Sequence, residues 1–137
     1  MAILPFQFDS GKMSLIGAAT AQTIVKGDML KDNGSGYAVP VVAGDGVDVR
    51  WIAMESVTTT ADGQQILAMS TDGVTFIADC DAAWSITDIG TNCDIAAAGQ
   101  LDPDAASDNI FAIERGVGTA EVGTKVIGQF TRGTPNS

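Results

Sequence analysis

Hydrophobic positions along the chain come in short runs that are separated by turn residues. Runs rich in β-branched and aromatic side chains are interrupted by Gly, Asp and Asn every roughly 8 to 12 residues, a spacing typical of antiparallel strands. The pattern predicts one short helical turn within residues 82–89, and strands at residues 23–25, 37–42, 47–57, 64–69, 74–79, 93–97, 110–115 and 124–130. We therefore expect a mainly β fold, a small β-barrel or sandwich of short antiparallel strands.

Glycines mark the expected turns between these strands, because glycine adopts the positive φ that tight hairpins require. They fall in the segments 26–28, 33–36, 45–46, 62–63 and 72–73. The pair Asp72-Gly73 lies between two expected strands and is the clearest hairpin signal in the chain.

Alternating positions indicate which strand faces are buried. One side of the strand at 74–79 carries Val74, Phe76 and Ala78, and one side of the last strand carries Val126, Gly128 and Phe130. The strand at 47–57 is apolar on both sides, since Trp51 and Ala53 alternate with Ile52 and Met54. A strand covered on both faces needs a second layer, which barrel closure, the N-terminal segment or a neighbouring subunit could supply.

The first 22 residues differ from the rest. Ile3, Leu4, Phe6 and Phe8 alternate around polar or breaking residues, and a stretch of small residues follows. We expect an extended N-terminal arm at 1–22 ahead of a single barrel domain at 23–137. The arm either closes the core of its own domain or adds to another chain by strand pairing, and we favour the second interpretation. Candidate partner or subunit contacts are Ile3, Leu4, Phe6, Phe8, Ile52 and Met54.

Composition supports one folded domain with an acidic surface. The 137 residues are 45% hydrophobic and 18% charged, with a net charge of -10. Residues 51–110 hold ten acidic residues and no Lys or Arg, whereas both ends of the chain are near neutral. We expect the middle to face solvent and the ends to meet a partner; solvated loops without any partner role are the alternative. Nucleic acid is not an expected partner.

The N-terminal segment and the two cysteines bear on export and on the redox state of the protein. The apolar start of the chain lacks a basic region and is broken by Pro5, so we expect neither an export signal nor a membrane anchor. Cys80 and Cys93 are expected to be buried thiols, although the sequence leaves their pairing open.

Catalytic and metal-binding motifs are not recognisable. The chain has no histidine, which removes the commonest general base and metal ligand. Ser35 lies between two glycines with no base to activate it, and carboxylate pairs such as Asp79 and Asp81 are expected by chance in an acidic chain. The acidic run 102–108 lacks the glycine and glutamate of a calcium loop. We expect no enzymatic activity, no cofactor and no metal.

Taken in order, the turn and strand segments resemble the small β-barrel cement, or decoration, proteins of tailed bacteriophage capsids. The resemblance covers residues 23–130 and rests on segments that share glycine turns leading into apolar strands: Thr23–Leu30, Gly36–Val41, Trp51–Glu55, Gly63–Leu67, Asp72–Ala78 and Gly123–Phe130.

The resemblance implies a non-enzymatic virion protein on the outer capsid surface. Such a protein, commonly a homotrimer, binds the major capsid protein of an assembled head and clamps neighbouring subunits together. In these families an N-terminal arm often makes capsid contacts, and here it would be Met1–Gln22. One alternative is a β-rich phage tail or fibre component or a carbohydrate-binding module. A glycan site needs aromatic side chains in loops, and Trp84 is the tryptophan outside the expected strands. A small enzyme is the least favoured alternative.

Overall fold

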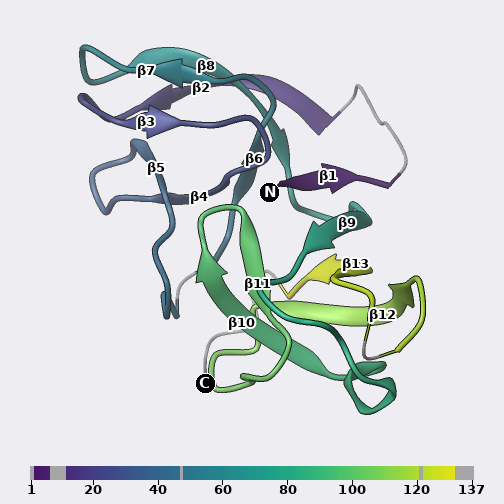
Figure 1. Cartoon of the computed structure of the whole chain (residues 1–137). Coiled ribbons are helices and arrows are strands. Elements are labelled where there is room, and N and C mark those ends of the chain that lie inside the picture. The colour runs from purple at the N-terminus through teal and green to yellow at the C-terminus, as the bar shows by residue number, and fades with distance from the viewer. Residues whose placement is uncertain (1, 7–11, 47, 121, 132–137) are drawn as a thin grey trace.

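The computed structural model describes residues 2–6, 12–46, 48–120 and 122–131. Within these ranges the chain is mainly β and forms two lobes (Figure 1). One is a closed barrel from the first half of the sequence, and the other is a curved sheet from the second half to which the N-terminal strand β1 is added. The predicted fold class is therefore confirmed.

The barrel has five strands in the order β2-β5-β4-β6-β8. Neighbouring strands are antiparallel except β2 and β5, which meet in parallel at Ala18 and Ala38. A two-stranded sheet, β3 with β7, lies at the same end of the molecule as β2 and β8 (Figure 1). The strands are β2 (Met13–Ala18), β3 (Thr23–Ile24), β4 (Met29–Asp32), β5 (Ala38–Pro40), β6 (Trp51–Ala53), β7 (Val57–Thr58) and β8 (Gln64–Ser70).

The second lobe is a six-stranded antiparallel sheet in the order β1-β9-β13-β12-β10-β11. Just after β9, Cys80 forms a parallel bridge with Leu101 of β11, so the sheet curls back on itself. The expected helical turn is present as a short 3-10 helix at Ile86–Asp88. The strands are β1 (Ile3–Pro5), β9 (Phe76–Asp79), β10 (Asn92–Ala97), β11 (Gln100–Asp102), β12 (Phe111–Val117) and β13 (Lys125–Phe130).

Strand β6 separates two hydrophobic cores. Trp51 and Ala53 pack with the small core inside the barrel, whereas Ile52 belongs to a larger core shared with the six-stranded sheet. In that larger core Phe130 packs edge-on against Phe76 and Phe111, with ring centroids 5.5 and 5.0 Å apart. The strand predicted at 47–57 is shorter in the structure, with β6 at Trp51–Ala53 and Val57 in β7. Its apolar character on both sides is explained by barrel closure on one side and the chain's own second sheet on the other.

The hairpin predicted at Asp72-Gly73 is wrong. Gly73 does adopt a positive φ of 70°, but β8 pairs with β2 and β6, and β9 pairs with β1 and β13. The turn therefore carries the chain from one lobe to the other. The predicted buried faces of β9 and β13 are confirmed, because Phe76, Ala78 and Val126 have no exposed surface.

Candidate functional site

The N-terminal strand β1 is docked on its own chain. Ile3 is completely buried, and its N–H donates to the Gly27 carbonyl at 3.0 Å. The Ala2 N–H donates to Asp79 Oδ2 at 2.7 Å. Gly27 has a φ of +93°, and a Cβ there would lie 2.4 Å from the Ala2 Cβ, so Ala2 packs directly on this glycine. The described residues of 1–22 therefore follow the first alternative, in which the segment closes its own domain, and not the favoured pairing with another chain.

The outer edge of β1 is a poor template for a further strand. Pro5 has no N–H, and the Ile3 N–H is already bound to Gly27. Proline and engaged donors are common ways of protecting an edge strand. A partner that meets β1 would thus contact side chains, with little help from backbone hydrogen bonds.

The outward face of β1 continues across the sheet as an apolar row. Leu4 pairs with Ile77, Ile77 with Ile127, and Ile127 with Arg115. Leu4 and Phe6 are 43% and 40% exposed, whereas Ile127 is only 7% exposed. We call this surface the β1 face and define it by Leu4, Phe6, Ile77, Arg115 and Ile127.

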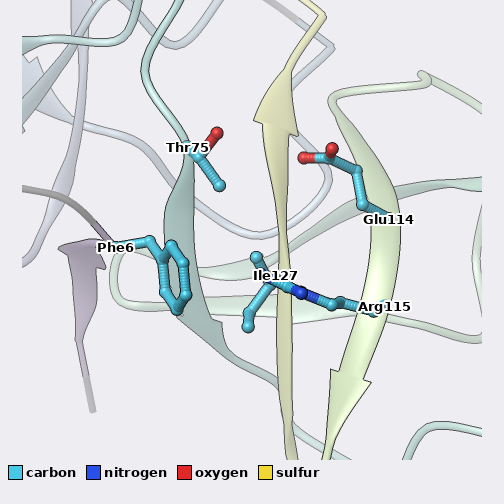
Figure 2. A pocket seen from close by; sticks show the side chains of 5 residues that line it. All are labelled: Phe6, Thr75, Glu114, Arg115 and Ile127. Atoms are coloured by element: carbon cyan, nitrogen blue, oxygen red, sulfur yellow. The ribbon is translucent and has the colours of Figure 1, made fainter.

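A hollow of about 340 Å³ opens on the β1 face, lined by Phe6, Thr75, Glu114, Arg115 and Ile127. Figure 2 shows the Arg115 side chain running over Ile127 toward Phe6, with Glu114 lying nearer the Thr75 end. The guanidinium carbon is 5.1 Å from the Phe6 ring centroid, a cation–π distance. Among the described residues, Arg115 forms no salt bridge.

A β-bulge explains why two charged neighbours share this face. The pairing of β12 with β13 shifts between Ile113 and Arg115, so one extra residue is accommodated in β12. Ile113 points into the core, and both Glu114 and Arg115 are exposed and line the hollow.

An ion pair borders the β1 face. The Lys125 ammonium donates to Asp79 Oδ1, while Asp79 Oδ2 holds the Ala2 N–H. Burial by itself raises the pKa of the Asp79 carboxyl, but the Lys125 and Ala2 hydrogen bonds and the nearby positive charge outweigh it and lower that pKa. Asp79 therefore ties the start of β1 to β13 in its ionised form.

The candidate contact residues separate into different environments. Ile3 and Ile52 have no exposed surface and pack in the shared core, so these two side chains are core residues and are not accessible to a partner. Met54 is partly buried against the same core. Leu4 and Phe6 lie together on the β1 face, and Phe8 falls outside the described residues.

The features considered for chemistry have structural roles. Both cysteines are buried free thiols, as expected, and burial with nearby carboxylates raises the pKa of Cys80 to about 12. Buried Asp94 accepts the backbone N–H groups of Ser107, Asp108 and Asn109, which organises the acidic loop that follows β11. Residues 2–6, 12–46, 48–120 and 122–131 contain no group of three or more His, Cys, Asp or Glu placed to hold a metal.

Trp84 is not available as a surface aromatic. It is only 6% exposed, its Nε1 donates to the Val117 carbonyl at 3.1 Å, and a Cβ at Gly116 or Gly123 would collide with its ring. The loop tryptophan considered for glycan binding is therefore a packing residue.

Sequence reasoning identified Leu4 and Phe6 and missed the other half of the β1 face. The available signal was charge: Arg115 is the one basic residue between Arg50 and Lys125. None of the helical segments in the described ranges is long and apolar enough to cross a membrane. No protein-family model matches the chain, and no curated protein matches its sequence.

Proposed function

We propose that this chain is a structural cement protein that binds the outside of an assembled bacteriophage head and stabilises contacts between major capsid protein subunits. The observation that carries the proposal is the β1 face, which exposes Leu4 and Phe6 and carries a hollow that Phe6 helps to line. Partly exposed apolar groups next to a cation–π pair are the kind of surface that protein partners bury. The order of glycine turns and strands adds the resemblance to capsid decoration proteins.

The distribution of charge favours the shell exterior. Of the ten acidic residues between 51 and 110, only Asp94 is buried, and the others have exposed or partly exposed side chains. Such a surface repels packaged nucleic acid and stays solvated. The β1 face, in contrast, takes its residues from the two near-neutral ends of the chain and from β9.

Stabilisation of the head would follow from mass action. A protein that binds only the assembled lattice favours that state, by roughly 2.7 kcal/mol per site at a free concentration about 100 times Kd. In a homotrimer, which we propose by analogy with the decoration proteins, three copies engage together and gain avidity.

Co-sedimentation with phage heads tests the proposal. The purified chain is mixed with mature empty heads and with immature heads of the phage that encodes it, and saturable binding to mature heads is expected. A double variant, Leu4→Ala with Phe6→Ala, should bind at least tenfold more weakly. Leu15→Ala is the matched control, because Leu15 is 59% exposed on the barrel strand β2, outside the β1 face.

Two results would overturn the proposal. Absence of binding to any head, together with retention on a glycan array, would assign the chain to tail, fibre or carbohydrate-binding proteins. Equal loss of binding in the Leu15 variant and the double variant would show that the β1 face is not the contact surface.

A further inference from the structure

We infer that the hollow on the β1 face receives one apolar side chain of a partner protein that carries a carboxylate beside it, with Arg115 as the anchor. The inference deepens the proposed function and rests on it for the identity of the partner, a segment of the major capsid protein.

Arg115 is preorganised for a carboxylate. It is exposed, and among the described residues it pairs with no acidic group, although the chain contains 17 acidic residues. Its guanidinium lies over the Phe6 ring, and Arg115 pairs in register with Ile127, so the contact with Phe6 limits the side-chain freedom that remains to be lost on binding. A planar guanidinium can then bind a carboxylate through two parallel hydrogen bonds.

The hollow has the dimensions of a side-chain pocket. Its volume of about 340 Å³ lies at the lower end of the range for small-ligand sites, which suits one large side chain and its flanking groups. Phe6 and Ile127 provide the apolar surface, and the Thr75 hydroxyl, which accepts a hydrogen bond from Gln129 Nε2 at 3.3 Å, provides a polar edge.

Glu114 gives the hollow a direction. Its carboxylate lies nearer the Thr75 end and Arg115 reaches toward Phe6, so the two charges are arranged along the hollow (Figure 2). A partner carboxylate is attracted at the Phe6 end and repelled at the other, where a neutral or basic group fits better. In the proposed homotrimer the β1 face of each copy is turned to the lattice, so the occupant of the hollow is the capsid segment and not a second copy of this chain.

A small probe tests the hollow without phage heads. N-acetylphenylalanine, an aromatic ring beside a carboxylate, is titrated into the folded chain while NMR follows the Phe6 ring and the Arg115 side chain. Saturable shifts are expected, with at least tenfold weaker binding for the neutral N-acetylphenylalaninamide and for the Arg115→Gln variant. The matched control is Arg50→Gln, an exposed arginine next to barrel strand β6, which should bind like the parent.

The outcomes distinguish this inference from the proposed function. Equal binding of the acid and the amide, or unchanged binding by Arg115→Gln, would overturn the role of Arg115. If heads bind the parent and Arg115→Gln equally, the inference fails and the cement function stands. If the probe binds through Arg115 but the chain binds no phage head, the inference about the hollow is supported and the cement function fails. A native mass that falls in Arg115→Gln alone would make a second copy the occupant and overturn the choice of partner.

Discussion

Ile3→Ala is expected to destabilise the whole fold, because β1 contributes a buried side chain to the core that both lobes share. Ile3 has no exposed surface and packs among residues of the barrel and of the six-stranded sheet. Truncating a fully buried isoleucine to alanine costs about 2–5 kcal/mol, and the cost is greatest where neighbours cannot collapse into the space. Here Gly27 binds the Ile3 N–H and Asp79 binds the Ala2 N–H, which restricts local collapse, so we expect a value in the upper half of that range.

The neighbouring residue provides the control. Leu4 is 43% exposed on the same strand, so Leu4→Ala should cost about 1 kcal/mol or less. Equilibrium urea unfolding, followed by tryptophan fluorescence, measures both variants against the parent. Domains are typically stable by about 5–15 kcal/mol, so Leu4→Ala should remain folded at zero denaturant, and Ile3→Ala should unfold at a clearly lower urea concentration than the parent.

Equal midpoints for the two variants would refute the reasoning, since Ile3 would then lie outside the cooperative core. The same argument applies to truncation. Deleting residues 1–12 removes Ile3 together with Leu4 and Phe6, so loss of partner binding in such a deletion would mix unfolding with loss of contact. Point variants on the exposed side of β1 avoid that ambiguity.

Further variants test the contacts that hold β1 and the state of the thiols. Gly27→Ala combines a positive φ with a collision at Ala2, and it should lower the free energy of unfolding by more than about 1 kcal/mol in the same urea assay. The folded-state pKa of Asp79 is lowered, so its stabilising effect is present above the ordinary aspartate pKa of about 3.9 and is lost as pH falls through the folded value. Asp79→Asn should therefore be less stable than the parent at pH 7, and the difference should shrink as pH falls below the ordinary aspartate pKa of about 3.9. A difference that does not change with pH would contradict the ion pair. With a pKa of about 12, Cys80 should not react with a thiol reagent at pH 8 in the folded protein and should react in 8 M urea, and rapid labelling of the folded chain would contradict its burial.

The alternation of apolar and polar residues predicted which face is buried in the strands that have one buried and one exposed face. Phe76 and Ala78, or Val126 and Phe130, point to one side of their strands because every second residue shares a face, and this rule needs no knowledge of the neighbouring strand. The turn glycines are also a local signal, and Gly27, Gly63 and Gly73 adopt the positive φ expected of them. The mainly β class followed from these two signals.

Strand partners depend on contacts between distant segments, and the sequence pattern did not supply them. Residues around Gly73 read as a hairpin, yet the two flanking strands enter different lobes because each finds a longer-range partner. Likewise, β1 pairs with β9 through Ile3 and Ala78, which lie far apart in the chain. The apolar N-terminal residues predicted a need for burial, but not which surface would satisfy it.

The candidate site likewise combines residues that the local pattern predicts with residues that only long-range strand pairing brings together. Exposure of Leu4 and Phe6 could be inferred from an apolar, alternating segment, whereas Arg115 joins them only through the register of β12 on β13 and β13 on β9. The bulge after Ile113 then turns two consecutive charged residues to one face, against the strict alternation on which the sequence reasoning relied.

The short strand β1 has two roles, which fall to residues on its two opposite faces. Ile3 points inward and fixes β1 to the core, whereas Leu4 and Phe6, one and three residues further along the chain, point outward and belong to the β1 face. A free arm would lose backbone entropy of about 1–2 kcal/mol for every residue ordered on binding, whereas β1 has already lost it on folding. A partner that binds Leu4 and Phe6 therefore meets a strand that is already ordered, and the affinity of that contact would depend on buried Ile3 because Ile3 holds the strand in place.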